Sequence, residues 1–182
     1  MAYSLDDFCR DGRQILMQEN NRGGRDKLRG KLETLLMDEG FQAEYLKTDD
    51  ESGLKQIYQD PDLDFCVLVY NMDEPRTSPP HDHGRSWAIY GQASGYTDMT
   101  EWARKDDGSN DRKADLEATK TYRLKPGMAG LFDVGDIHSI DYPQGAKFVR
   151  VTGKDMNQET RLIFNDKTGE ITKIEHVGTG DN

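Results

Sequence analysis

The most informative part of the chain is the run Pro80-His81-Asp82-His83-Gly84. In an extended strand, residues two positions apart point to the same face, so both imidazoles of this run can reach one ion. Imidazole suits iron, zinc, copper and nickel. The pair taken alone is equally compatible with two unrelated histidines, and Asp82 between them is expected to face away from the ion. A metal site therefore needs support from elsewhere in the sequence.

That support comes from a glycine-rich segment that ends in a third histidine. The segment Gly127-Met-Ala-Gly-Leu-Phe-Asp-Val-Gly-Asp-Ile-His138 places a Gly-Asp pair two residues before His138. Such a pair suits a tight turn, which would deliver His138 from a second strand. We therefore predict a metal site formed by His81, His83 and His138. We interpret His176, in the expected final strand, as an ordinary surface histidine.

Short apolar runs separated by turn residues follow from Leu54 onward and predict an all-β sandwich or barrel. The expected strands are 65–70, 87–92, 96–102, 121–124, 129–132, 148–152 and 161–164. The charged segment 103–119 is expected to be a loop, and the last strand is expected to continue into a hairpin around 165–169.

The first fifty residues instead show helical signals. Ser4 followed by Asp7 resembles a capping box with Asp in place of Glu. A break at 20–24 is expected, followed by a second helix at 25–39 that ends at Gly40. Both helices are expected to cover one face of the barrel.

Length and composition narrow the class of protein. With 182 residues the chain suits one domain, which we divide into helices at 1–50, a barrel with the metal site at 54–165 and a C-terminal strand extension at 166–182. The net charge of −10 argues against nucleic-acid binding. The chain has no apolar run long enough for a membrane span and no signal peptide, so we expect a cytoplasmic protein in which Cys66 is a buried free thiol.

The histidine segments resemble the two motifs of the cupin superfamily. The first motif has a Glu five residues after its second histidine and then a glycine; here Ala88 stands at the Glu position and Gly95 at the glycine position. The second motif maps onto Gly127, Asp133, Gly135 and His138, with Asp in place of the usual Pro. The resemblance implies a mainly β double-stranded β-helix barrel with an N-terminal helical segment.

A three-histidine site without the Glu is similar to the thiol dioxygenases of the cysteine dioxygenase family. The order of segments from Leu54 to Gly84 also resembles that family, which implies Fe(2+), with Ni(2+) or Zn(2+) as alternatives. The sequence departs from the family at several positions. Lys55 stands where these enzymes use an arginine for the substrate carboxylate, and 148–152 lacks their Ser-His-Tyr series.

The expected function is oxygen insertion into a small anionic thiol or a related chelating substrate. Arg150 is the candidate for holding the anionic group, because a guanidinium binds a carboxylate bidentately, and Tyr90 is the candidate for a hydrogen bond near the metal. Two alternatives stay open: a three-histidine cupin that acts as a hydrolase, isomerase or carbon–carbon cleaving enzyme, and a noncatalytic metal- or ligand-binding cupin. The expected partners are a small-molecule substrate and O2, in a monomer or homodimer.

Overall fold

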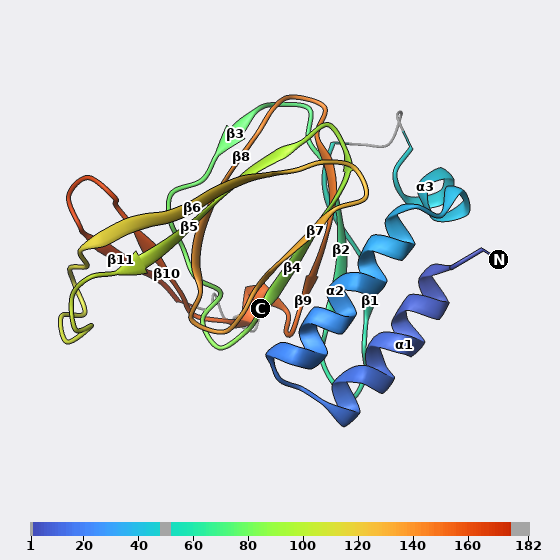
Figure 1. The fold of residues 1–182 in the computed structure, drawn as a ribbon, viewed down its shortest axis with the longest axis horizontal. Helices are drawn as coiled ribbons and strands as arrows, with labels where there is room; N and C mark the ends of the chain where they lie inside the picture. Colours follow the sequence, from blue (N-terminus) through green and yellow to red (C-terminus); the bar gives the residue numbers. More distant parts are fainter. Residues whose placement is uncertain (1, 48–51, 176–182) are drawn as a thin grey trace, which may run out of the picture.

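The computed structural model describes residues 2–47 and 52–175 (Figure 1). Within these ranges no helix is long and apolar enough to cross a membrane. His176, interpreted from the sequence as a surface histidine, lies outside the described residues. The division of the chain at 50, 54, 165 and 166 stays a prediction.

Two antiparallel sheets face each other and form the barrel (Figure 1). The first sheet has the order β1-β2-β9-β4-β7, with strands β1 (Gly53–Gln59), β2 (Cys66–Asn71), β9 (Lys147–Thr152), β4 (Ala88–Ser94) and β7 (Ala129–Phe132). The second has the order β3-β8-β5-β6, with strands β3 (Arg76–Thr77), β8 (Ile137–Tyr142), β5 (Thr97–Arg104) and β6 (Leu116–Leu124).

The chain passes from one sheet to the other several times: β3, β5, β6 and β8 of the second sheet alternate along the sequence with strands of the first sheet. This path is that of a double-stranded β-helix, and with the N-terminal helices it confirms the predicted fold class. A separate hairpin, β10 (Arg161–Phe164) with β11 (Ile171–Ile174), follows the short 3-10 helix η1 (Met156–Gln158). The hairpin around 165–169 was therefore predicted correctly.

Three helices cover the first sheet on the side away from the second sheet (Figure 1): α1 (Leu5–Gln18), α2 (Arg22–Leu36) and α3 (Glu39–Tyr45). Ser4 and Asp7 form the expected capping box. The predicted break at 20–24 is too long, because the Asn21 side chain accepts hydrogen bonds from Gly23 and Gly24 and starts α2 there. The stop expected at Gly40 is also wrong: the Asp38 side chain caps a further short helix that contains this glycine.

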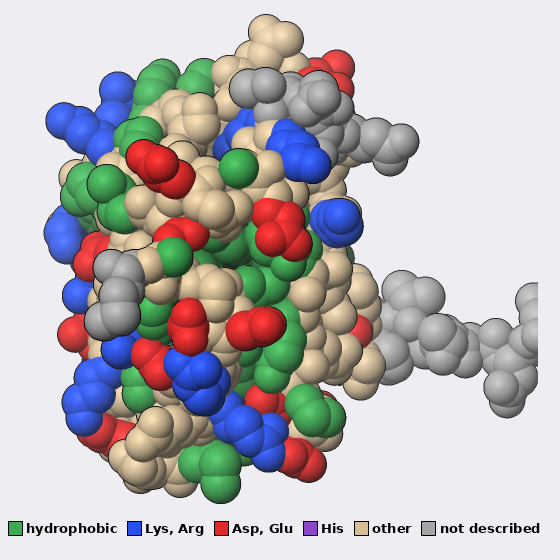
Figure 2. Space-filling view, turned by 90° about the vertical axis from the view of Figure 1, so that its right-hand side faces the viewer, with side chains coloured by type: hydrophobic (Ala, Val, Ile, Leu, Met, Phe, Trp, Pro, Cys, Tyr) green, Lys and Arg blue, Asp and Glu red, His purple; other side chains and the backbone are tan. Residues whose placement is uncertain are grey.

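The main apolar core lies between the helices and the first sheet. Its members include Leu28 and Leu32 of α2 and Val149 and Val151 of β9. Gly91 of β4 allows α2 to approach, because a Cβ atom there would lie 2.7 Å from the Cδ1 of Leu36. The outer surface of the helices intermixes acidic and basic side chains with smaller hydrophobic areas (Figure 2).

All seven expected strands occur, most of them with bounds within two residues, whereas β1, β3 and β8 are not among the expected strands and β6 begins earlier than expected. The expected loop at 103–119 is too long, since β6 already begins at Leu116. The polar stretch that follows forms a strand because it pairs with β5, where Arg104 lies opposite Leu116. Tertiary pairing has overridden local composition there.

Candidate metal centre

The three predicted ligands are positioned by two segments that lie side by side. His138 is on β8, and His81 forms an isolated antiparallel bridge with it. The backbone hydrogen bonds of this bridge measure 2.9 Å from His81 N to His138 O and 3.0 Å from His138 N to His81 O. His83 follows in an extended segment without regular strand structure. The strand expected around the H-x-H pair is therefore reduced to two isolated bridges of His81, one with His138 and one with Ile163, yet the two imidazoles still face the same side.

The imidazoles of His81, His83 and His138 converge. One ring nitrogen from each lies within 4.8 Å of those of the other two. The ring centroids are 4.5 Å apart for His81 and His138, 4.9 Å for His83 and His138, and 5.6 Å for His81 and His83. This spacing brings three donor atoms around one point.

The hydrogen bonding of the three rings fits a bound cation. Both ring nitrogens of His138 and the Nδ1 of His83 are buried without a hydrogen-bond partner. Buried polar atoms without partners are rare and indicate an ion or water at the site. The Nδ1 of His81 lies 3.0 Å from the carbonyl of Pro79, so in the neutral ring it donates there and leaves Nε2 free for a metal.

Burial also sets the charge of the rings. It lowers the pKa of His83 and His138 well below the ordinary value, and the neighbouring imidazoles lower both further. Burial lowers the pKa of His81 as well, with Arg161 and Arg150 acting in the same direction. The three rings are therefore neutral near pH 7, which is the form that binds metals.

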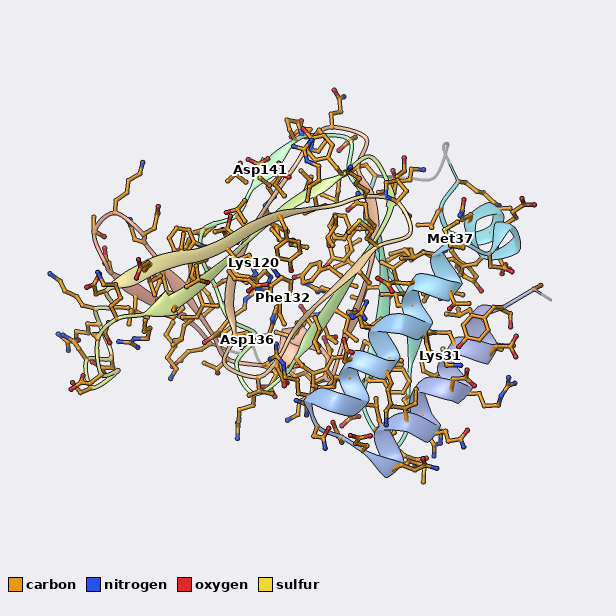
Figure 3. The ribbon with its side chains drawn as sticks, viewed as in Figure 1. Lys31, Met37, Lys120, Phe132, Asp136 and Asp141 are labelled. Atoms are coloured by element: carbon orange, nitrogen blue, oxygen red, sulfur yellow. The ribbon has the colours of Figure 1, made fainter. Side chains whose placement is uncertain are left out.

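Within the described residues, the surroundings of the site provide no carboxylate ligand. Ala88, at the position of the cupin glutamate, is fully buried and contributes only a methyl group. Among the described residues, the metal-ligating group contains the three histidines alone. Phe132 lies in the interior of the barrel (Figure 3) and stacks on His138 with 3.8 Å between ring centroids. A cation here would keep its full charge, because all its protein ligands are neutral.

Tyr90 and Arg150, the other two predicted site residues, lie beside the histidines. They occupy paired positions on β4 and β9, and Tyr70 and Tyr90 raise the pKa of Arg150 against the effect of its burial. The Tyr90 hydroxyl also lies 3.3 Å from the Nε2 of His83. The guanidinium of Arg150 lies 5.1 Å from the ring centroid of Tyr70, and its Nε is buried without a hydrogen-bond partner. The structure thus brings all five predicted residues together, while their roles remain to be tested.

A cavity of about 420 Å³ adjoins these side chains. His81, Tyr90 and Arg150 contribute to its wall. Two further arginines, Arg76 and Arg161, also line it, and no acidic residue does so among the described residues. Lys55 is exposed and lines a different cavity, between α3 and the β1–β2 edge. A lysine there does not take the place of a substrate-binding arginine at the metal centre.

Sequence reasoning missed Tyr70, Arg76, Phe132 and Arg161 as residues of the site. A signal was present for Phe132, which belongs to the same glycine-rich segment as His138. No sequence signal indicated Arg161, because its position depends on the contact between β10 and the H-x-H segment. Asp82 makes that contact: its backbone N donates to Leu162 O, and its Oδ1 accepts from Leu162 N at 2.9 Å. Asp82 faces away from the metal position, as expected.

Comparisons with known proteins find solved structures of low similarity to this chain. No protein-family model and no curated protein matches the sequence. Among solved structures, KdgF from Halomonas sp. is 18% identical with a TM-score of 0.41, covering 54% of this chain and 74% of that one. The cupin domain of Schizosaccharomyces pombe Cnp3 is 13% identical with a TM-score of 0.41, covering 56% and 60%. An uncharacterized Klebsiella pneumoniae protein with a double-stranded β-helix domain is 16% identical with a TM-score of 0.38, covering 73% and 93%.

Proposed function

We propose that this protein is a mononuclear, metal-dependent enzyme that oxidises a small anionic chelating substrate with O2, in the manner of a thiol dioxygenase. The observation that carries the proposal is the convergence of three neutral imidazoles, of which His83 and His138 are buried and His81 is half-buried, next to a cavity with arginines and no described acid in its wall. His81, His83 and His138 would hold the ion. The resemblance of the histidine motifs favours Fe(2+) over Ni(2+) and Zn(2+).

The charge of the site favours an anionic ligand. A dication bound by three neutral imidazoles keeps its charge of +2, and coordination lowers the pKa of a thiol or water bound to it. When bound, iron would supply the redox chemistry that activates O2. The overall change would add both oxygen atoms to a thiolate sulfur and give a sulfinate. A thiolate with a second donor group meets both the charge and the chelation requirement.

The residues of the chain would orient the substrate. Arg150 can bind a carboxylate through two parallel N–H···O hydrogen bonds, and its buried Nε is one donor that still needs an acceptor. Tyr90 touches both Arg150 and His83, so its hydroxyl can fix the guanidinium relative to the metal position and donate to the substrate. Phe132 on His138 and the methyl of Ala88 keep the inner side of the site apolar.

The proposal is tested by the bound metal and by oxygen uptake. Protein produced without added metal is analysed for its metal content, and O2 consumption is then measured with a panel of small thiols that carry a carboxylate or an amine. We expect iron, with oxygen consumption that depends on the thiol. Zinc without oxygen uptake would instead support a hydrolase, isomerase or carbon–carbon cleaving cupin. Tight metal binding without turnover of any chelator would support a noncatalytic cupin.

The role of Arg150 has its own test. Arg150→Ala should raise KM for the thiol at least about tenfold, because a charge-assisted hydrogen bond stabilises by about 1.5–3 kcal/mol. Iron content should not change, since Arg150 is not a ligand. The matched control is Arg112→Ala, which removes an exposed arginine outside the cavity wall. Unchanged kinetics of the Arg150 variant would remove this residue from the substrate site.

The remaining expectations follow the same proposal. We propose a small-molecule substrate and O2 as partners, without nucleic acid, in a cytoplasmic monomer or homodimer. Size-exclusion chromatography with light scattering distinguishes the two oligomeric states.

A further inference from the structure

The cavity beside the metal centre carries more positive charge than one substrate anion needs. Its wall contains Arg76, Arg150 and Arg161, whereas the whole chain has 34 acidic and only 24 basic residues. Within the described part of the chain, none of these arginines forms an ion pair, although most other arginines do. Unpaired charges in a partly buried position are costly. A ligand with matching negative charge would remove that cost.

Arg161 is placed by the same contacts that place the metal ligands. His81 lies opposite Ile163 in an antiparallel bridge, and Asp82 N donates to Leu162 O at 3.1 Å. Continuing this register brings Arg161 opposite His83. Residues directly opposite each other in an antiparallel pair project to the same face. Arg161 therefore lies on the histidine side of β10, where it lines the cavity.

Arg150 and Arg161 reach the cavity from different elements. Arg150 comes from β9 in the first sheet and touches Tyr90, whereas Arg161 comes from the β10–β11 hairpin. Tyr70 lies within electrostatic range of both: burial raises its pKa to about 12, while Arg150 and Arg161 act in the opposite direction. Arg76 is exposed and lies close enough to Tyr142 to counteract the rise that burial causes in the pKa of that hydroxyl, so it is the less available of the two further arginines. The cavity next to His81 is thus bordered by two guanidiniums, one from β9 and one from the β10–β11 hairpin.

We propose that the substrate is a dianion: one anionic group lies with the metal-chelating end next to Arg150, and a second carboxylate, or an anion of similar shape, is bound by Arg161. This inference rests on the proposed function for the identity of the chelating end. The second anion site itself depends only on Arg161 and the cavity. A molecule with one anionic group would leave Arg161 uncompensated and would bind more weakly.

The test compares two acids with the same chelating end. The probes are 2-hydroxyglutarate and 2-hydroxypentanoate, which share a hydroxycarboxylate but differ in the distal carboxylate. Their affinity for protein loaded with Zn(2+), which performs no redox chemistry, is measured by calorimetry. We expect 2-hydroxyglutarate to bind at least about tenfold more tightly, as one charge-assisted pair is sufficient for this factor. Equal affinities would overturn the proposal.

Variants assign the difference to Arg161. Arg161→Gln should remove the tenfold preference and leave the affinity for 2-hydroxypentanoate within about twofold, whereas Arg161→Lys should retain part of the preference. Arg112→Gln, which removes an exposed arginine on the segment that hydrogen-bonds Ile171 of the same hairpin, should change neither affinity. Equal losses for both probes in Arg161→Gln would show a structural role only and would contradict the proposal.

A metal-free arm distinguishes this proposal from the proposed function. Succinate and butyrate are compared on protein stripped of metal, where chelation plays no part. A preference for succinate that disappears in Arg161→Gln supports the second anion site even if no oxygenase activity is found. Conversely, thiol-dependent oxygen uptake without a preference for dianions in either arm would support the proposed enzyme function and contradict the second anion site.

Discussion

The two faces of the first sheet are made by the same strands and serve different ends. On β9, Val149 and Val151 point toward the helices and are fully buried in the main core. The residues that alternate with them, Phe148 and Arg150, point into the barrel and line the cavity. β4 repeats the pattern, with Ile89 in the main core and Tyr90 beside the histidines.

This difference shows that neighbouring residues of one strand can serve different purposes: one stabilises the fold and the next lines the site. Side chains alternate between the faces of a strand, so one face can be filled with branched apolar residues while the other holds polar groups. The apolar side chains buried between the helices and the first sheet then stabilise the fold that positions the polar groups inside the barrel. Substitutions on the two faces should accordingly affect different measurements.

The largest expected effect is on the metal-binding face. His138→Ala should weaken metal binding by more than about 100-fold, because even groups that only support a ligand affect metal affinity by about 10–100-fold. Metal titration followed by atomic-emission analysis measures the change. The metal-free variant should remain folded, since both ring nitrogens of His138 lack partners and their loss removes no hydrogen bond. Unfolding of metal-free His138→Ala would contradict the separation of the two faces.

The next effect is on the helix-covered face. Leu32→Ala should lower the free energy of unfolding by about 2–5 kcal/mol, because Leu32 is fully buried and its loss leaves a cavity against β4. Urea denaturation measures this, and metal affinity of the folded variant should match the wild type. Met17→Ala is the control: this side chain on α1 is 66% exposed, and its removal should change stability by less than about 0.5 kcal/mol. A large loss of metal affinity in folded Leu32→Ala would break the comparison.

The smallest effect concerns a polar contact that joins α1 to the barrel. The side chain of Asp60 is buried, accepts from the backbone N of Asp62 and Leu63, and pairs with Arg13 at 2.7 Å. Burial alone would raise its pKa, but these donors outweigh burial and hold the pKa below the ordinary value. At pH 7, Asp60→Asn should lower the free energy of unfolding by about 1–3 kcal/mol.

The pH dependence of that effect follows from the depressed pKa. The unfolded carboxyl titrates near pH 3.9, so the stabilisation by Asp60 is fully present above that pH and is lost as pH falls through the lower pKa of the folded state. The difference between wild type and Asp60→Asn should therefore shrink below about pH 4. Denaturation at pH 7 and pH 3 checks this, with metal-free protein used throughout. A difference that grows on acidification would show that Asp60 is not charged in the folded state.

Much of this structure could be predicted from local sequence signals. The capping box at Ser4 indicated the first helix, the apolar runs indicated the strands of the barrel, and the H-x-H pair with the segment Gly127–His138 indicated the three candidate ligands. Element boundaries were less accurate where a side chain or a partner strand decides them. Asn21 and Asp38 start helices at glycines where the local sequence predicts breaks, and β6 extends through a polar stretch because β5 pairs with it.

By itself the sequence determined the alternation of apolar and polar residues, the helical segment before the barrel, and three histidines spaced for a common site. These are local properties, set by which side chains share a face of a strand or helix. Only the tertiary structure decided that His81 lies opposite Ile163 of β10, that Phe132 stacks on His138, and that the cavity wall lacks acids among the described residues. Those features arise from contacts between segments far apart in the chain, where no local rule records which residues will meet.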